Sequence, residues 1–131
     1  MDDTGDLDFW LGDWTCTDPA DGSVGTNRIR RVLDGRVVEE TFAIVDAAGQ
    51  VLNGRSWSVL DKERGWLQTW VDDQGSYLDF TGGPTAEGFV FARPGSRMVF
   101  RDITAEGFTW DWEKDGQLVW QLRYVRAAAP S

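Results

Sequence analysis

The chain of 131 residues contains no histidine and a single cysteine, Cys16. The missing histidine excludes a Ser-His-Asp triad, a histidine general base, histidine-ligated haem and the usual zinc sites. A single cysteine cannot form an internal disulfide, which is typical of a reducing compartment, so we expect a cytoplasmic protein. Cys16 has no basic neighbour in the sequence, and we expect an inert thiol. These absences predict no metal site and no cofactor, and they leave carboxylates, cysteine and tyrosine for any chemistry.

Positive charge is also scarce. The chain has 13 lysines and arginines against 22 acidic residues, for a formal net charge of −9. This balance argues against nucleic acid or an anionic membrane as a partner, because phosphate groups would repel the protein. No apolar run approaches the ~18 residues of a membrane helix. Residues 1–8 have neither the basic nor the apolar region of a signal peptide.

Aromatic residues are abundant, with eight Trp, seven Phe and two Tyr. Glycines in turn-like contexts separate short segments rich in Val, Ile, Thr, Phe and Trp, a composition typical of strands. We expect about ten strands, at residues 14–18, 23–33, 36–45, 51–60, 66–73, 76–81, 88–92, 97–103, 108–113 and 117–126. No long segment has the period of an amphipathic helix.

A long antiparallel meander must close or split to remove its edge strands. The predicted fold is therefore all-β: a single antiparallel up-and-down β-barrel of about 8–10 strands with a short N-terminal helical turn. We expect residues 1–7 to be a disordered acidic segment, residues 8–126 to form the barrel, and residues 127–131 to be a C-terminal tail.

The Asp-Gly pair in "LDGR" at 33–36 predicts a tight hairpin turn. That turn would pair Ile29 with Glu40 and Arg30 with Glu39. The face that carries Glu40 would point inward and would also carry Arg31, as a diagonal neighbour close enough to pair with it.

Two further hairpins decide where the aromatic residues point. "WEKDGQL" at 112–118 is interpreted as a three-residue loop, pairing Trp110 with Trp120 and Phe108 with Leu122. "DKERGW" at 61–66 leaves two alternatives open. A four-residue loop turns Ser56 and Ser58 inward and Trp70 outward; a one-residue slip turns Gln68, Trp70 and Asp72 inward. If Trp57, Trp66 and Trp70 were all outward, they would form an exposed patch suited to a homodimer.

The stretch "DFWLGDW" at 8–14 contains a Gly-x-Trp, Gly12-Asp13-Trp14, just before the first expected strand. In this it resembles lipocalins, fatty-acid-binding proteins and nitrobindins, the calycin superfamily. The resemblance implies that Trp14 closes one end of the barrel and that an arginine of the last strand, Arg126 or failing it Arg123, packs over its ring. With "NRIRRVLDG", "VVEETF" and "WLQTWVD", the chain is similar to bacterial lipocalin-like domains of unknown function over residues 8 to about 72. Haem binding does not carry over, because no histidine is present.

Inside such a barrel, Glu40 is the residue hardest to explain structurally. It is either a functional carboxyl, as a general base or as a grip on a ligand's polar group, or half of a buried ion pair that fixes strand register. If the protein is an enzyme, the catalytic candidates are Glu40 and, more remotely, Asp72 and Asp111. The candidate ligand-binding residues are Arg31, Phe42, Ser56, Ser58, Gln68, Trp70, Phe100, Trp110, Trp112, Trp120 and Tyr124.

Three functions remain open at this point. The first is binding of a small, largely hydrophobic molecule in the barrel. The second is a cofactor-independent cyclase, isomerase or hydratase of secondary metabolism that acts on such a molecule. The third is a dimeric structural or interaction module with a filled barrel.

Overall fold

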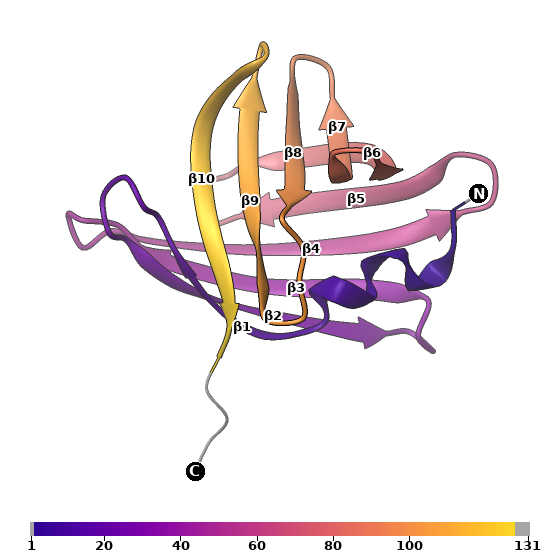
Figure 1. Ribbon diagram of the computed structural model, residues 1–131, viewed down its shortest axis with the longest axis horizontal. Helices are drawn as coiled ribbons and strands as arrows, with labels where there is room; N and C mark the ends of the chain where they lie inside the picture. The colour runs from indigo at the N-terminus through magenta and orange to yellow at the C-terminus, as the bar shows by residue number, and fades with distance from the viewer. Residues whose placement is uncertain (1, 128–131) are drawn as a thin grey trace.

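The computed structural model describes residues 2–127, and this part of the chain folds into a closed barrel (Figure 1). Each strand pairs antiparallel with its neighbours in sequence, and β1 pairs with β10 to close the ring. The elements are the 3-10 helix η1 (Thr4–Trp10) and the strands β1 (Gly12–Thr17), β2 (Val24–Val32), β3 (Val37–Val45), β4 (Val51–Asp61), β5 (Gly65–Asp72), β6 (Tyr77–Thr85), β7 (Gly88–Arg93), β8 (Ser96–Arg101), β9 (Gly107–Lys114) and β10 (Gln117–Arg126). The predicted all-β up-and-down barrel is confirmed.

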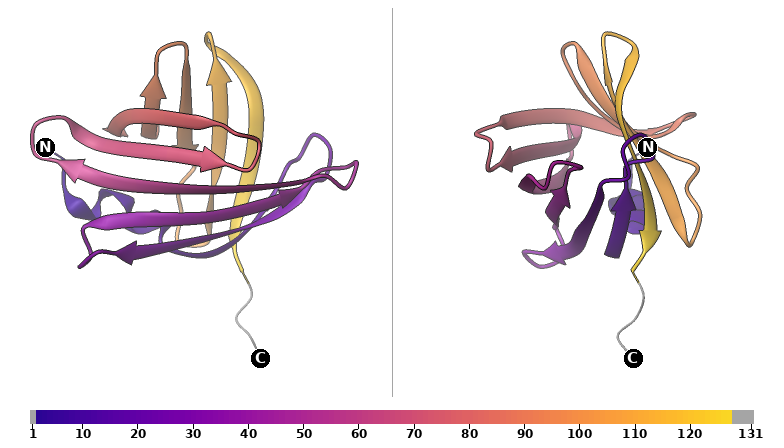
Figure 2. Two further views of the ribbon diagram at one scale, coloured as in Figure 1. Left: turned by 180° about the vertical axis from the view of Figure 1, so that it is seen from behind. Right: turned by 90° about the vertical axis from the view of Figure 1, so that its left-hand side faces the viewer.

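The barrel is flattened, and its two halves run in different directions. Figures 1 and 2 show the long strands β3, β4 and β5 crossing β8, β9 and β10 at a steep angle. The core lies between these two layers, as in orthogonal sheet packing. β6 is longer than predicted, because Gly82 allows its backbone to approach β7 closely. A Cβ at Gly82 would lie 1.8 Å from the carbonyl oxygen of Val90.

The expectation of a disordered N-terminus is wrong for residues 3–7. Asp3 caps η1, where its side chain accepts a hydrogen bond from Gly5 N at 2.6 Å and its backbone N–H donates to Asp6 at 2.8 Å. Leu7 is fully buried. Capping and burial together offset the entropy of ordering this segment. Ala127 donates its backbone N–H to Asp13 O at 2.9 Å, while residues 1 and 128–131 lie outside the described part of the chain.

The β2–β3 hairpin has the predicted register, with Ile29 opposite Glu40 and Arg30 opposite Glu39. Asp34 and Gly35 have φ values of 61° and 78°, the left-handed pair that a type I′ turn requires.

The predicted register of the β9–β10 hairpin is wrong by two residues. Asp115 and Gly116 form a two-residue turn, with φ values of 50° and 79°, in place of the three-residue loop. The shorter turn shifts the register by one residue, and a β-bulge further along β10 shifts it by one more, so Trp120 lies opposite Trp112 instead of Trp110. A bulge between Leu118 and Trp120 leaves Leu118 exposed while Trp120 faces inward.

The β4–β5 hairpin follows the second of the two sequence alternatives. Asp61 pairs with Gly65 across a three-residue loop, and Gly65 has a φ of 79°. Trp66 and Trp70 therefore point inward, and only Trp57 lies outside, with 37% of its surface exposed. These three tryptophans therefore form no exposed patch, and no homodimer surface of that kind is present in the described part of the chain. No helix within residues 2–127 is long and apolar enough to cross a bilayer.

Candidate functional site

A cavity of about 210 Å³ lies inside the barrel. Most of its lining side chains are apolar, and they come from η1, β3–β6 and β8–β10. The lining residues are Trp10, Glu40, Phe42, Leu52, Trp70, Asp72, Leu78, Phe80, Met98, Phe100, Trp110, Trp112, Trp120, Leu122 and Tyr124. An engineered cavity of about 150 Å³ holds benzene, whereas sites for drug-sized ligands begin at about 300 Å³. The space therefore suits a molecule of one or two rings.

The aromatic walls are held by contacts between the rings themselves. The Phe42 and Trp70 centroids lie 6.0 Å apart, and Trp110 meets Trp120 edge to face at 5.2 Å. The indole N–H of Trp70 donates to Asp72 at 2.9 Å, and that of Trp120 donates to Asp18 at 3.0 Å. Rings fixed in this way offer preorganised surfaces for an apolar ligand.

Gly54 is a positioning residue that the sequence analysis missed. It is a buried glycine of β4, and the Trp70 ring lies directly over its Cα. A Cβ at Gly54 would lie 2.1 Å from the Trp70 ring. The available signal was a glycine inside a predicted strand, which often marks a close approach of another group.

Glu40 is a buried carboxyl whose hydrogen-bond partners are neutral. Its Oε2 accepts from Asn27 Nδ2 at 2.6 Å, and its Oε1 accepts from Ser56 Oγ at 2.7 Å. Asn27 Nδ2 also donates to the hydroxyl of Tyr124 at 3.0 Å. Burial raises the pKa of Glu40, and the hydrogen bonds from Ser56 and Asn27 only partly oppose that rise.

The predicted ion pair between Arg31 and Glu40 is wrong. Arg31 pairs with Asp8 of η1 and donates to Thr4 O at 2.9 Å, so it lies outside the cavity. The long arginine side chain reaches the acidic helix that packs at this end of β2. Since the sequence analysis treated most of that helix as disordered, it offered Arg31 no other partner.

Asp72 is the second carboxyl of the cavity lining. It accepts hydrogen bonds from Trp70 Nε1 and from the backbone N–H groups of Gln74 at 2.9 Å and Ser76 at 3.1 Å. Burial, the largest single effect, raises the pKa of Asp72, but these hydrogen bonds together outweigh it and leave the pKa below its usual value. The two cavity carboxyls therefore have pKa values shifted in opposite directions.

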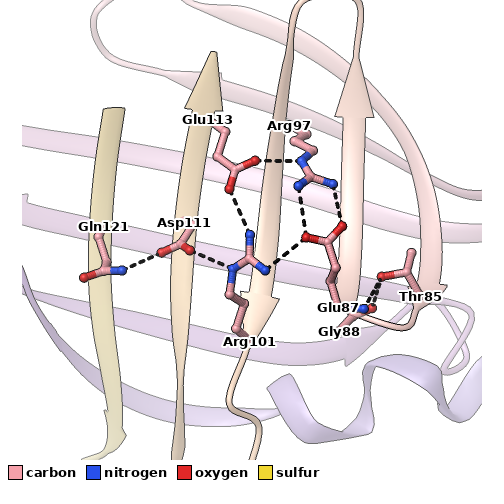
Figure 3. A network of polar contacts seen from close by, with 8 residues as sticks. All are labelled: Thr85, Glu87, Gly88, Arg97, Arg101, Asp111, Glu113 and Gln121. Atoms are coloured by element: carbon pink, nitrogen blue, oxygen red, sulfur yellow. Dashed lines mark hydrogen bonds and ion pairs between the residues drawn. The ribbon is translucent and has the colours of Figure 1, made fainter. Parts of the chain in front are cut away.

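Asp111, the third catalytic candidate, lies on the outer face of β9 and does not line the cavity. It accepts from Arg101 Nε at 2.8 Å and from Gln121 Nε2 at 2.9 Å. Figure 3 shows these contacts continuing through Glu113 and Arg97 to Glu87. Asp111 thus belongs to an ion network on the outer surface of β8 and β9.

The other candidates divide into two groups. Those that line the cavity are Phe42, Trp70, Phe100, Trp110, Trp112, Trp120 and Tyr124. Ser56, Ser58 and Gln68 are buried but do not line it; Ser56 holds Glu40, and Gln68 Nε2 donates to Ser58 at 3.0 Å. The lining residues that the sequence analysis did not nominate are Trp10, Leu52, Leu78, Phe80, Met98 and Leu122. Assigning a face to each residue of the alternating segments 76–81 and 97–103 could have found Leu78, Phe80 and Met98.

Trp14 of β1 packs against Arg126 of β10, the residue opposite it in the strand ladder. The Arg126 guanidinium carbon lies 4.3 Å from the Trp14 ring centroid, and Trp14 Nε1 donates to Trp10 O at 2.7 Å. Arg126 also donates to Leu11 O at 3.0 Å. Gly12, with a φ of 130°, leaves room for the guanidinium, because a Cβ there would lie 2.6 Å from Arg126 Nη1. Nearby Cys16 is buried, and burial raises the pKa of its thiol to about 11.

The fold and cavity define a closed ten-strand antiparallel barrel with a hollow, aromatic interior over residues 2–127. Neither a protein-family model nor a curated protein sequence matches the chain. Among solved structures, the chain is similar to a de novo designed protein described as a fluorescence-activating beta barrel. The TM-score is 0.51 at 11% sequence identity, and the match covers 92% of this chain and 96% of that one. At this identity the likeness shows the fold alone.

Proposed function

We propose that the protein binds a small, largely apolar aromatic molecule inside the barrel. The observation that carries this proposal is the 210 Å³ cavity, which is lined mainly by aromatic and aliphatic side chains. Burying an apolar ligand there removes its surface from water, and contact with the fixed rings adds to the affinity. The similar designed barrel is described as fluorescence-activating, which agrees with a functional role for a barrel of this kind.

We also infer a relationship to the calycin barrels, supported by the Gly12-Asp13-Trp14 motif and by Arg126 packed over Trp14. Ligand binding within the barrel is the activity that this resemblance implies. A cytoplasmic location stays a prediction from the single cysteine.

The binding proposal is tested by titrating toluene, indole and naphthalene into the protein, followed by isothermal calorimetry and by NMR of the tryptophan indole N–H groups. We expect at least one compound to bind and to shift the indole signals of Trp110 and Trp120. Native mass spectrometry of freshly purified protein would reveal a ligand that co-purifies.

A matched pair of variants locates the site. Leu78 of β6 lines the cavity, whereas its neighbour Tyr77 is exposed on the outside. Leu78→Trp fills the cavity and is expected to weaken binding at least about tenfold, or about 1.4 kcal/mol. Tyr77→Trp is expected to leave binding unchanged. If the wild type binds none of these compounds and no polar analogue such as 2-phenylethylamine or 2-phenylethanol, or if Leu78→Trp binds as well as the wild type, the proposal is wrong.

A second candidate function is cofactor-independent catalysis on such a molecule. The observation that favours it is the pair of cavity carboxyls, Glu40 with a raised pKa and Asp72 with a lowered one. Opposite shifts of this kind are typical of an acid and a base that act on one substrate. Glu40 would supply or accept a proton while the aromatic walls hold a flexible substrate in a reactive shape.

The two functions are separated by recovering a bound compound after incubation and analysing it by mass spectrometry. Catalysis predicts a chemically changed compound, and it predicts that Glu40→Gln abolishes the change while binding persists. An unchanged compound supports binding alone.

A further inference from the structure

The acidic and basic side chains that line the cavity are all carboxyls. These two carboxyls, Glu40 and Asp72, form no ion pair with any lysine or arginine of residues 2–127, and no basic side chain of this part of the chain lines the cavity. A carboxylate ligand would therefore meet like charge with no cation to offset it, in a site where burial weakens screening. This lining disfavours fatty acids and other organic anions.

Glu40 has unused capacity to accept hydrogen bonds. A carboxylate offers about four acceptor positions, and here two are taken, by Asn27 and Ser56. Both donors are neutral, so they orient the carboxyl without cancelling its charge. A buried carboxylate without a counter-charge is costly, and a ligand that brings a positive charge would remove that cost.

Aromatic rings lie next to this carboxyl. Phe42 is the next inward residue after Glu40 on β3, and its ring lies 6.0 Å from Trp70 and 6.4 Å from Trp120. Trp70 is directly opposite Ser56, which donates to Glu40. A carboxylate beside several aromatic rings is the combination that recognises an organic ammonium group, through an ion pair and cation–π attraction.

We propose that the natural ligand is a small organic amine, bound as its ammonium form, with the positive group at Glu40 and an aromatic or apolar body between the tryptophans. The inference rests on the proposed binding function and specifies the charge class of the ligand. Asp72, the second carboxyl of the cavity lining, adds a negative potential that favours a cation entering the cavity.

Three probes of nearly equal shape test this charge preference: 2-phenylethylamine, 2-phenylethanol and phenylacetate, each titrated by calorimetry at neutral pH. We expect the amine to bind at least about tenfold tighter than the alcohol. Phenylacetate is expected to bind more weakly than the alcohol. This comparison needs no variant, so it does not depend on whether a substituted protein folds.

Two variants of adjacent residues assign the preference to Glu40. Glu40→Gln keeps the side-chain shape, and its amide can still accept from Asn27 Nδ2 through the oxygen while its N–H donates to the Ser56 hydroxyl, which can accept as well as donate. It should bring amine and alcohol affinities to within a factor of about three of each other, with alcohol binding retained. Glu39→Gln makes the same charge change on the outer face, where Glu39 accepts from Trp57 Nε1. It should leave the amine preference intact.

The outcomes separate this inference from the function on which it rests. Equal affinity of the wild type for amine and alcohol overturns the amine inference and leaves cavity binding standing. An amine preference that survives Glu40→Gln also overturns it, because the charge would then be recognised elsewhere. Failure of all three probes, together with toluene, indole and naphthalene, overturns the binding function itself.

Discussion

Replacing Gly54 by alanine is expected to move Trp70 and to reshape the cavity. Gly54 is buried, and its φ lies outside the left-handed region, so the backbone itself tolerates alanine. The new Cβ would lie 2.1 Å from Trp70 Cη2 and 2.3 Å from Cζ2. Since carbon atoms pack at about 3.5–4.0 Å, the indole has to move by about 1.5 Å. That movement disturbs the Trp70 hydrogen bond to Asp72 and its contact with Phe42.

The expected cost follows from two opposing effects. Overpacking a core by a methyl group costs about 1–3 kcal/mol, while a glycine inside a strand already costs about 0.5–1 kcal/mol relative to alanine. The net loss for Gly54→Ala is then about 1–2 kcal/mol of unfolding free energy, measured by urea denaturation. Calorimetry with indole should show weaker binding at the same time.

A double-mutant cycle with Trp70→Leu tests the mechanism. Leucine does not extend as far as the indole, so Gly54→Ala in that background should be neutral or stabilising by about 0.5 kcal/mol. The expected coupling energy between the two sites is about 1–2.5 kcal/mol. If Gly54→Ala is equally destabilising in both backgrounds, the glycine is not there to accommodate Trp70, and the reasoning is wrong.

Two further predictions concern buried polar groups. Trp14→Phe loses the hydrogen bond to Trp10 O, whereas Trp10→Phe removes an indole N–H that has no partner in residues 2–127. Urea denaturation should therefore show that Trp14→Phe lowers the unfolding free energy by about 1–2 kcal/mol more than Trp10→Phe does. Equal losses in the two variants would contradict this. Burial raises the pKa of Glu40 above 4.5, so the unfolded chain releases this proton at lower pH than the native protein does. The contribution of Glu40 to the stability of the wild type therefore falls as pH rises above 4.5. Glu40→Gln lacks that fall, and its stability relative to the wild type should increase by at most about 1.4 kcal/mol per pH unit. A difference that does not change with pH would refute this, since the neighbours Cys16 and Tyr124 have raised pKa values and stay neutral over the range.

Local turn chemistry explains which parts of the fold could be predicted. Asp34 and Gly35 both adopt the left-handed conformation of a two-residue turn, so the β2–β3 register and the inward position of Glu40 followed from the sequence. Asp115 and Gly116 form the same turn, but the bulge after Leu118 changes which residues of β10 face inward. A bulge depends on neighbouring strands and has no clear local signal here.

The residues whose roles were misjudged are those that depend on distant parts of the chain. Arg31 pairs with Asp8 because η1 packs beside the end of β2. Asp111 belongs to a network with Arg101 and Gln121 from the two neighbouring strands. Periodicity assigns a side chain to a face of its strand, but it does not identify the partner that another segment brings to that face.

The absence of the predicted ion pair between Glu40 and Arg31 also supports a functional role for Glu40. The sequence left two interpretations open, a functional carboxyl and half of a buried ion pair, and the second required Arg31. Since Arg31 pairs with Asp8 of η1, only the neutral donors Asn27 and Ser56 hold Glu40 within residues 2–127. A core selected for stability alone gains nothing from such a carboxyl, because an apolar residue of similar size avoids the desolvation cost. Local rules are broken in this way mainly at functional sites, and here the exception lines the cavity among aromatic rings.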